Sequence, residues 1–383
     1  MNTSLSILTY LNFDCPTAEQ KSALSAMADF VKEDNKDDFL ILCGAAGTGK
    51  TSITSALIGY LNQLEIQYKV AAPTSRAARI LGKKTNVPNS TIHAMIYLAV
   101  ANPETGEVHF KLKSSEEEDY CIFIVDEASM INAESKTVDG AMFFADNSLL
   151  HDLTKYIKDL NPKNKLILLG DKNQLPPIYE LESYALMPEY LNKKYNWKGT
   201  SHILTEVKRQ EDGSYILKNA IRIRKGIDDG KKVEEIEIEA FKFNTIYQCA
   251  DQYVNDYKAN KEDFCISIGC THKSNQLFNE LVRERLFGKD VGLVVKGDLM
   301  LVLQSWVRDE QKLYNGDHVV VEDISLDKIE AIGGLHFAPA KLRSKTLSGE
   351  DVITELLISS QLRCGGFIDQ PKFCIRKNFI CAV

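Results

Sequence analysis

One glycine-rich run constrains the fold of this chain more than any other feature of its sequence. Residues Gly44 to Thr51 read GAAGTGKT, which satisfies the pattern GxxxxGK[ST]. The run follows the continuous apolar segment 39–43 and precedes a segment expected to be helical. Between a strand and a helix, this pattern is typical of a loop whose backbone N–H groups surround phosphate oxygens. The sequence therefore predicts a nucleotide-phosphate site at the edge of a parallel sheet.

The residues of this loop have distinct chemical tasks. Glycines let backbone N–H groups turn toward the phosphates, Lys50 supplies a positive charge to the β- and γ-phosphate oxygens, and Thr51 offers a hydroxyl to Mg²⁺. The alternative is an ordinary strand-to-helix turn that matches by accident, and the flanking segments weigh against it. The predicted nucleotide-binding residues of the loop are Gly44, Ala45, Ala46, Gly47, Thr48, Gly49, Lys50 and Thr51.

Short apolar runs along the chain predict the sheet to which this loop belongs. The segments between them are long enough for crossover helices, and this alternation is typical of a doubly wound α/β sheet. The runs span residues 39–43, 70–72, 121–125, 166–169 and 265–268. A helix is expected after Thr17, because Leu24, Met27 and Val31 recur at helical spacing, with Thr17 and Gln20 as a candidate capping box.

Three later segments indicate how the chain is organised. Turn residues 102–106, between two β-prone segments, predict a hairpin that protrudes over about residues 97–115. The acidic run 233–239 follows a basic segment and marks a first boundary, after which a second α/β unit is expected. From Val291 onward the chain is punctuated by glycine and rich in β-prone residues, as a small β-barrel would be.

Charge and composition exclude several classes of protein. Lys and Arg total 46 against 53 Asp and Glu, a net charge of -7, so nucleic acid would have to bind at local basic patches. No apolar run approaches the ~20 residues of a membrane span. The first dozen residues lack the features of a secretory signal, so we expect the mature chain to begin at Met1 and to be cytoplasmic. Nine scattered cysteines without a CxxC pair indicate reduced thiols rather than a zinc site or a disulfide framework.

Two further loops at the ends of predicted strands carry groups suited to nucleotide hydrolysis. Asp126 would hold Mg²⁺ and Glu127 would orient or deprotonate the attacking water, although an acidic pair after a strand is also a common surface feature. Residues 170–178 follow the next strand, and an amide there, that of Gln174, can hydrogen-bond a γ-phosphate or its water. Considered locally, the same segment is equally well explained as a strand ended by prolines.

In their order along the chain, these segments resemble the motifs of superfamily 1 DNA helicases of the 5′→3′ class, the RecD-like and Dda-like enzymes, over roughly residues 17–316. The resemblance implies an α/β P-loop NTPase fold with a RecA-like ATP-binding lobe over residues 1–235. It further implies a partial second RecA-like lobe over 236–300, followed by a small β-barrel-like region and a tail over 301–383. ATP and Mg²⁺ are the implied cofactors, and DNA repair or recombination is the implied setting.

The resemblance also assigns roles to individual residues. Residues 17–20 are similar to the Q motif, which makes Gln20 a reader of the adenine edge, while its local role as a helix cap stays open. Residues 204–209 are similar to motif IV, which makes Arg209 an arginine finger near the γ-phosphate; a solvated surface arginine is the alternative. The implied catalytic residues are Lys50, Glu127, Gln174 and Arg209.

Four segments resemble elements that meet DNA in this family. Residues 72–78 resemble motif Ia, 91–93 the element after it, and 271–275 the element that opens the second lobe. Their hydroxyl, amide and basic groups suit a phosphate backbone, while a basic crossover helix and a helix cap are local alternatives. The hairpin corresponds to the pin that splits the duplex, or is a plain surface hairpin. The candidate DNA-binding residues are Pro73, Thr74, Arg76, Arg79, Thr91, His93, Phe110, Thr271, Lys273 and Asn275.

One part of the family pattern has no counterpart in this sequence. Motifs V and VI, approximately TxHKxQG and YVxxTR, are not found after Gly316. Two hypotheses follow, a truncated product or a degenerate member, and either predicts slow hydrolysis with little stimulation by DNA. The interpretation adopted is an ATP-dependent DNA helicase that acts on single-stranded DNA or its junction with duplex. The rivals are a nucleotide-dependent DNA-binding protein without motor activity and, less well matched, a P-loop small-molecule kinase.

Overall fold

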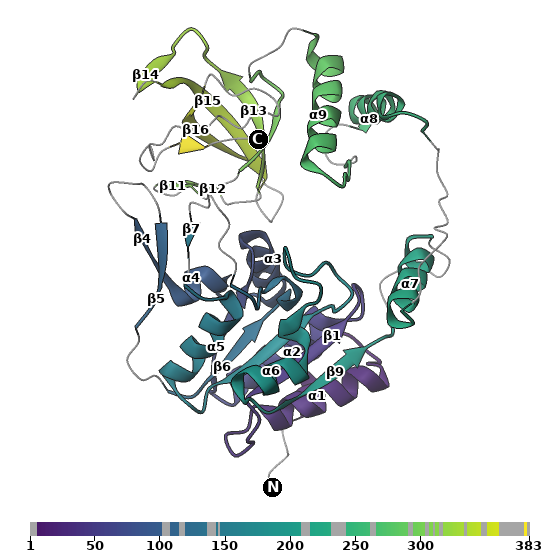
Figure 1. Cartoon of the computed structure of the whole chain (residues 1–383), viewed down its shortest axis with the longest axis vertical. Coiled ribbons are helices and arrows are strands. Elements are labelled where there is room, and N and C mark those ends of the chain that lie inside the picture. Colours follow the sequence, from purple (N-terminus) through teal and green to yellow (C-terminus); the bar gives the residue numbers. More distant parts are fainter. Residues whose placement is uncertain are drawn as a thin grey trace. The chain divides into compact units, whose positions relative to one another are not determined.

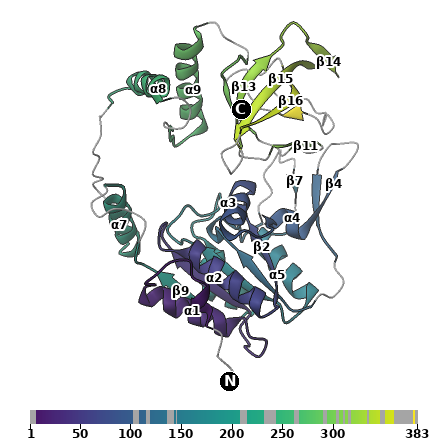
Figure 2. The same ribbon diagram turned by 180° about the vertical axis from the view of Figure 1, so that it is seen from behind.

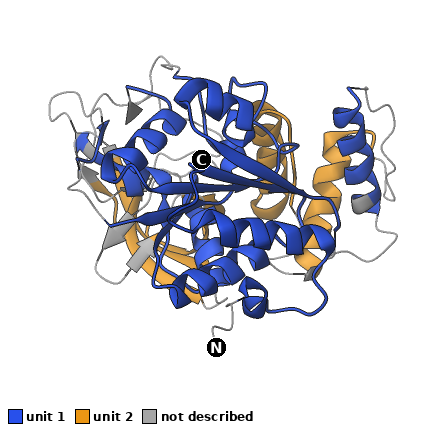
Figure 3. Cartoon of the chain, turned by 90° about the horizontal axis from the view of Figure 1, so that it is seen from below, with its two compact units in different colours: residues 1–238 blue, residues 239–383 orange. Residues whose placement is uncertain are grey.

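The chain divides into two compact units, residues 1–238 and residues 239–383 (Figure 3). Among the residues that the computed structural model describes, no helix is long and apolar enough to cross a membrane. The cysteines it describes are free thiols, namely Cys15, Cys43, Cys121, Cys249 and Cys270. The described residues are 6–101, 108–114, 119–135, 143–144, 146–207, 215–230, 243–260, 266–289, 294–302, 306–308, 311–313, 317–332, 335–345, 351–359 and 379–380.

A six-stranded sheet forms the centre of the first unit (Figure 1). Its strands are β1 (Phe39–Gly44), β2 (Gln67–Ala72), β3 (Ser90–Thr91), β6 (Cys121–Val125), β8 (Lys165–Gly170) and β9 (Gly199–Leu204). They lie in the order β3-β2-β6-β8-β1-β9, and neighbouring strands are parallel. The predicted α/β P-loop NTPase fold is therefore confirmed, with the apolar runs as its central strands.

Helices cover both faces of this sheet, as the opposite views in Figures 1 and 2 show. The helices described in this unit are η1 (Ile7–Tyr10), α1 (Ala18–Phe30), α2 (Lys50–Gln63), α3 (Ser75–Thr85), α4 (Ile92–Ile96), η2 (Ala128–Met130), α5 (Leu149–Leu160), η3 (Tyr184–Leu186), α6 (Pro188–Tyr195) and α7 (Tyr215–Asp228). Successive strand side chains point to opposite faces. In β1, Leu40 and Leu42 therefore join the core with α1 and α2, whereas Phe39 and Ile41 join the core with α4 and α5.

The predicted start of α1 is confirmed. The hydroxyl of Thr17 accepts a hydrogen bond from the backbone N–H of Gln20 (3.1 Å), and the Gln20 side chain accepts one from the N–H of Thr17 (2.9 Å). These two bonds form a capping box, which satisfies N–H groups that a helix start leaves without partners. The predicted apolar face, Leu24, Met27 and Val31, is fully buried.

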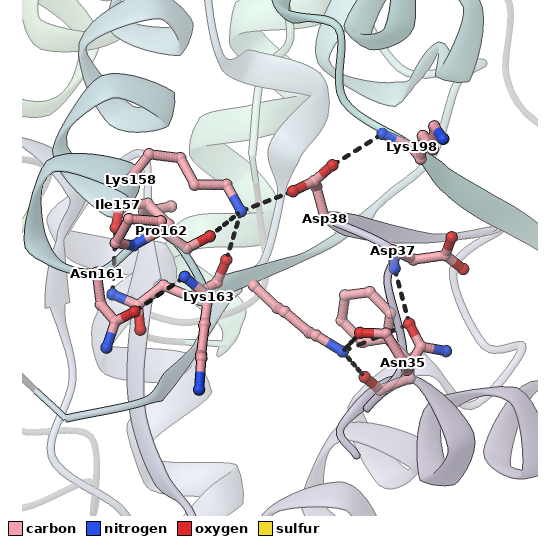
Figure 4. A network of polar contacts seen from close by, with 12 residues as sticks. Asn35, Asp37, Asp38, Ile157, Lys158, Asn161, Pro162, Lys163 and Lys198 are labelled. Carbon is pink, nitrogen blue, oxygen red and sulfur yellow. Dashed lines mark hydrogen bonds and ion pairs between the residues drawn. The ribbon is translucent and has the colours of Figure 1, made fainter. Parts of the chain in front are cut away.

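A polar network joins elements at the amino-terminal edge of the sheet (Figure 4). Asp38, just before β1, accepts one hydrogen bond from the ammonium of Lys158 (2.7 Å) and another from the N–H of Lys198 (3.0 Å). Lys158 also donates to the carbonyl oxygens of Pro162 and Asn164 (both 2.9 Å). The network therefore ties the end of α5 to the start of β1 and to the residue preceding β9.

A second lysine at this edge closes the end of α1. Lys165, the first residue of β8, donates from its ammonium to the carbonyl oxygens of Phe30 (2.6 Å), Lys32 (2.9 Å) and Asn35 (2.9 Å). Carbonyl groups at the end of a helix lack intrahelical partners, and a cation there also interacts favourably with the helix dipole. Lys165 thus fixes α1 against the middle of the sheet.

The hairpin predicted over residues 97–115 is confirmed. Strand β4 (Tyr97–Ala101) pairs antiparallel with β5 (Val108–Leu112), and Tyr97 lies opposite Leu112. A short strand, β7 (Phe143–Phe144), pairs parallel with β5 and completes a three-stranded sheet. The predicted turn at 102–106 lies outside the described residues.

The second unit combines two helices with strands that pair antiparallel, except for one parallel pair at the end of the larger sheet. Helices α8 (Ile246–Asn260) and α9 (His272–Phe287) pack through a small core of Ala250, Phe278 and Leu281. Five strands lie in the order β10-β13-β15-β16-β17, β14 pairs with β15, and β11 pairs with β12. The strands are β10 (Leu299–Leu301), β11 (Trp306–Arg308), β12 (Gln311–Leu313), β13 (His318–Ile324), β14 (Glu330–Ile332), β15 (Leu335–Lys345), β16 (Asp351–Ser359) and β17 (Phe379–Ile380).

This β-rich region agrees with the composition after Val291. Its closure into a barrel stays a prediction. So does the likeness of residues 236–300 to a second RecA-like lobe. The acidic run 233–239, where the first boundary was expected, lies outside the described residues.

The prediction of a buried strand over residues 265–268 is wrong in its described part. Residues 266–269 have no regular secondary structure, and the side chains of Ile266 and Ile268 are 81% and 90% exposed. An apolar run becomes a buried strand only where neighbouring strands receive it. None of the strands described in this unit pairs with this run.

Candidate nucleotide site and its surroundings

The segments predicted to bind nucleotide leave the central sheet at one edge. Parallel strands carry their carboxyl ends to the same side. The strand register places Cys43 beside Gly170 and Val125 beside Leu168. Strand β8 lies between β1 and β6, so the loop that follows it emerges between the phosphate loop and the acidic pair. Sequence alone predicted each loop, and the sheet brings the three together.

The phosphate loop has the backbone conformation that its glycines predict. Gly47 and Gly49 have φ angles of 88° and 94°, which are strained for a residue that carries a Cβ. Lys50 begins α2, and its ammonium donates to the carbonyl oxygens of Gly44 (2.5 Å) and Ala45 (3.2 Å). The positive charge is therefore held inside the loop that is predicted to surround the phosphates.

Gln20 connects the start of α1 to this loop. Its side chain is 2% exposed; the oxygen takes part in the capping box, and the nitrogen donates to the carbonyl oxygen of Thr48 (3.0 Å). A Cβ on Gly49 would come within 2.7 Å of that nitrogen. Gln20 thus supports the phosphate loop in addition to capping a helix, and its recognition of adenine stays a prediction.

Asp126 and Glu127 follow β6 in a tight turn. The carboxylate of Asp126 accepts a hydrogen bond from the N–H of Glu127 (2.9 Å). Glu127 has a left-handed φ of 53°, a strained conformation that is found most often at functional sites. Burial raises the pKa of Asp126, and burial together with the charge of Asp126 raises the pKa of Glu127. A raised pKa suits a carboxylate that accepts a proton from water near neutral pH.

Lys50 and three carboxylates form one electrostatic cluster. Burial lowers the pKa of Lys50, while the charges of Asp126, Asp171 and Glu127 oppose this effect. Asp171 is the first residue after β8, and its side chain is 5% exposed. One ammonium among three carboxylates leaves an excess of negative charge, which a divalent cation with oxygen ligands would neutralise.

The loop after β8 is held at its far end. One oxygen of the Glu180 carboxylate accepts hydrogen bonds from the N–H of Ala133 (2.7 Å) and of the next residue (3.0 Å). The hydroxyl of Ser183 donates to the carbonyl oxygen of Ser129 (3.1 Å). Both partners belong to the segment that follows the acidic pair. Gln174 lies exposed between the anchored ends of this loop.

Arg209, the predicted arginine finger, lies outside the described residues. The segment that leads to it is anchored, because Glu19 accepts hydrogen bonds from the backbone N–H (2.7 Å) and the hydroxyl (2.5 Å) of Thr205. These bonds lower the pKa of Glu19. The residue next to Gln20 in α1 thus fixes the chain shortly before Arg209.

Three threonines predicted to contact DNA cap helices. Thr74, Thr91 and Thr271 each accept a hydrogen bond from a backbone N–H three residues later, at 3.2, 3.1 and 3.1 Å. The helix-cap alternative for Thr271 is therefore confirmed, and a capping hydroxyl can still donate to a phosphate oxygen. Arg76 is exposed, Pro73 and Arg79 are half-buried, and in the second unit Lys273 and Asn275 are exposed. No contact between these residues and DNA is tested by the geometry, so their role stays a prediction.

An aromatic cluster lies at the base of the hairpin. His93 packs against both Tyr97 and Phe110, with ring centroids 5.6 and 5.5 Å away, and those two rings stack on each other at 5.5 Å. The hydroxyl of Tyr97 donates to Asp152 of α5 (2.7 Å). Burial lowers the pKa of His93, which favours the neutral ring. Half-buried packing gives His93 and Phe110 a structural role here, and their contact with a base stays a prediction.

The residues at this edge fit a nucleotide with Mg²⁺. The start of the loop is packed too tightly for a side chain at Gly44, since a Cβ there would lie 2.6 Å from the hydroxyl oxygen of Thr48. In the described part of the chain, Ser129 Oγ and Asn173 Nδ2 are buried without a hydrogen-bond partner, so they can serve groups that enter the site. The hydroxyl of Thr51 and the carboxylate of Asp126 are the oxygen ligands that Mg²⁺ prefers.

Four polar residues at this site were not predicted. Asp171 follows a buried strand as Asp126 does, so its position was a usable signal. Glu19, Glu180 and Arg224 were not recognisable, because their partners are far away in the sequence: Thr205 for Glu19, Ala133 for Glu180 and Asp171 for Arg224, the last 53 residues apart.

Comparison with known proteins agrees with this geometry. Residues 28–180 match the AAA_19 family, described as an AAA domain. The chain is 27% identical over 301 residues to the ATP-dependent DNA helicase dda of Enterobacteria phage T4, a match covering 76% of this chain and 62% of the phage protein. It is 32% identical over 139 residues to the ATP-dependent RecD2 DNA helicase of Deinococcus radiodurans, covering 36% of this chain and 16% of that protein.

A third relative extends the pattern. Over 203 residues the chain is 25% identical to the RecBCD enzyme subunit RecD of Haemophilus influenzae, a match covering 47% of this chain and 28% of that subunit. The chain spans less than two thirds of the length of each of these relatives. It contains a P-loop ATPase domain and is a distant homologue of the Dda and RecD helicases, which confirms the resemblance that the motifs predicted.

Proposed function

From its distant homology to the Dda and RecD helicases, we propose that this chain is an ATP-dependent DNA helicase of superfamily 1. It couples ATP hydrolysis to 5′→3′ movement on single-stranded DNA. The observation that supports this proposal most is the geometry of one sheet edge. There the phosphate loop, the acidic pair and the loop with Gln174 follow three adjacent strands, β1, β6 and β8.

The phosphates of ATP would lie against residues whose charges and pKa values suit hydrolysis. Lys50 would exchange its bonds to two loop carbonyls for the β- and γ-phosphate oxygens. Thr51 and Asp126 would hold Mg²⁺, which supplies positive charge to the phosphates when bound. Glu127, with its raised pKa, would accept the proton of the attacking water. Gln174 would hydrogen-bond the γ-phosphate or that water.

Two further groups complete the proposed nucleotide site. Gln20 would recognise the adenine edge from the position that it holds against Thr48. Arg209 would approach the γ-phosphate from the segment anchored by Glu19, and charge of this kind stabilises the transition state of phosphoryl transfer.

Single-stranded DNA, or its junction with duplex, is the proposed partner. In the first unit, the candidate contacts follow β2 and β3, at the same sheet edge as the phosphate loop. Helix α3 adds Arg76, Arg79, Lys83 and Lys84, whose charges suit a phosphate backbone. The hairpin β4–β5 would act as the pin that separates strands. The role of residues 236–300 as a second motor lobe, and a role of the protein in DNA repair or recombination, follow from the resemblance alone. The cytoplasmic location stays an expectation from the sequence.

A pair of assays tests the proposal. Steady-state ATP hydrolysis is measured with and without a single-stranded oligonucleotide, beside displacement of a strand from forked duplexes that carry either a 5′ or a 3′ tail. Hydrolysis stimulated by DNA, with displacement confined to the 5′-tailed fork, would support the helicase proposal, whereas slow hydrolysis with little stimulation is the result that the missing motifs V and VI predict. Binding of ATP and DNA without displacement would favour the non-motor rival. Hydrolysis that requires a small-molecule acceptor would favour the kinase.

DNA binding has a matched control within the first unit. Replacing Arg76 and Arg79 with alanine should weaken binding about equally for all sequences and reduce its dependence on salt, because fewer counterions are released. The control replaces Lys193 and Lys194, which end α6 a few residues before β9 begins, at the opposite edge. It removes the same charge and should leave affinity unchanged. Equal losses in both variants would contradict a groove along α3.

A further inference from the structure

Helix α7 is attached to the nucleotide site by a buried ion pair. The guanidinium of Arg224 donates through two nitrogens to the two carboxylate oxygens of Asp171, at 3.1 and 2.7 Å. The side chain of Asp171 is 5% exposed and that of Arg224 is 32% exposed. A planar guanidinium matches both oxygens of a carboxylate at once, which a lysine cannot do. The pair therefore fixes the direction of the Asp171 carboxylate as well as its charge.

A second ion pair of opposite polarity lies one helical turn away. The ammonium of Lys172 pairs with Asp228 at 3.1 Å, and both side chains are about half exposed. Consecutive residues of the loop, one acidic and one basic, thus face a basic and an acidic residue of α7. This order of charges matches the register of the helix against the loop. The exposed pair contributes little energy, so the buried pair carries most of the attachment.

Asp171 needs a partner because of its position. It lies at the end of β8, beside β1, and its charge acts on Lys50 across the site. A buried carboxylate without a partner would attract the ammonium of Lys50 and compete with phosphate for it. Asp171 also accepts a hydrogen bond from the N–H of Asn173 (3.1 Å), in the turn that leads to Gln174. Its orientation therefore affects two predicted catalytic groups.

We propose that Arg224 is a positioning residue for ATP hydrolysis. By occupying both oxygens of Asp171, it keeps Lys50 available to the phosphates and fixes the turn that presents Gln174. This role rests on the proposed ATPase function. Helix α7, the last described helix of the first unit, thereby takes part in the proposed nucleotide site.

Four variants test this role. Arg224→Gln should raise the KM for ATP and lower kcat, with a combined loss in kcat/KM on the order of 10²-fold, because it leaves a buried carboxylate unpaired. Arg224→Lys keeps the charge but not the paired hydrogen bonds, and should lose less. The double variant Asp171→Asn with Arg224→Gln should recover most of the activity, because a neutral amide does not compete for Lys50. Lys225→Gln, an exposed neighbour on the same helix, is the control and should match the wild type.

Each variant is melted, and its equilibrium affinity for a fluorescent ATP analogue is measured beside its hydrolysis rate. Recovery by Asp171→Asn would support the role, because a helix that merely stabilised the fold would not be restored by removing its remaining partner. Wild-type kinetics in Arg224→Gln, or no recovery in the double variant, would overturn it. A wild type that binds the analogue without hydrolysing ATP would overturn the proposed function, while the affinities would still test Arg224.

Discussion

Polar groups at the two edges of the central sheet differ in how completely they are hydrogen-bonded. At the amino-terminal edge, Asp38, Lys158 and Lys165 have hydrogen bonds to carboxylates, carbonyls or N–H groups at every charged end. At the carboxyl-terminal edge, Glu127 is strained, and Ser129 Oγ is buried without a partner in the described part of the chain. Burial disfavours the charged forms of Lys50, Asp126 and Glu127 at that edge, and at the amino-terminal edge it likewise lowers the pKa of Lys165 to about 8.

This difference separates groups that stabilise the fold from groups that remain available for chemistry. A buried polar group with all its partners adds stability, whereas one without partners lowers it. The strained Glu127 and the hydroxyl of Ser129, which has no partner among the described residues, lie at the edge that is proposed to bind ATP. Changes at the amino edge should lower stability but not turnover per folded molecule, whereas changes at the carboxyl edge should lower turnover without lowering stability.

The largest expected effect is at the phosphate loop. Lys50→Ala should reduce ATP hydrolysis by at least ~10²-fold and weaken binding of Mg²⁺-ATP, because it removes the charge that faces the β- and γ-phosphates. Lys158→Met at the amino edge is the matched control and should keep turnover per folded molecule. Steady-state hydrolysis and calorimetric titration measure the two effects. Normal turnover in Lys50→Ala would contradict the assignment of the loop.

A second large effect is expected at the amino edge. Asp38→Ala should lower the free energy of unfolding by about 2 kcal/mol, because it removes hydrogen bonds from a charged lysine and a backbone N–H. Asp159→Ala, which breaks an exposed pair with Lys155 in the same helix, should cost less than about 0.5 kcal/mol. Urea unfolding compares them. Equal losses would mean that the Asp38 network contributes no more than a surface pair.

The pH dependence of hydrolysis should reflect Glu127. Because its pKa is raised above the usual 4.5, turnover should fall as the pH drops, with a midpoint above that value. The folded state binds more protons than the unfolded state between the two pKa values, so the contribution of Glu127 to stability declines as the pH rises through that interval. Rate profiles and melting curves over the same pH series test both statements. A midpoint at or below 4.5 would exclude Glu127 as the group that controls turnover.

Local signals in the sequence predicted much of the first unit. Apolar runs gave four central strands, and the glycine pattern gave the phosphate loop, because both depend on neighbouring residues. The capping box of Thr17 and Gln20 was predictable for the same reason. The contacts that join distant segments were not: Asp38 meets Lys158 at a separation of 120 residues, and Thr205 meets Glu19 at 186. Such pairs depend on the assembled sheet.

The failed prediction has the same physical origin. An apolar run can be read from the chain, but the strands that would bury it cannot. The run 121–125 lies between two parallel neighbours, whereas the described part of 265–268 has none. A residue pattern therefore predicts an element well where the surrounding fold is also recognisable.

The smallest expected change in stability belongs to the variant that tests the contrast between the edges most directly. Glu127→Gln should raise the thermal midpoint of the nucleotide-free protein at neutral pH, because it removes a buried charge whose pKa is raised, and it should abolish turnover while ATP still binds. Melting without nucleotide and hydrolysis with Mg²⁺-ATP are measured on the same preparation, beside Asp38→Ala. A higher midpoint with no turnover for Glu127→Gln, and a lower midpoint with normal turnover for Asp38→Ala, is the predicted result. A Glu127→Gln protein that melts earlier and still hydrolyses ATP would contradict it.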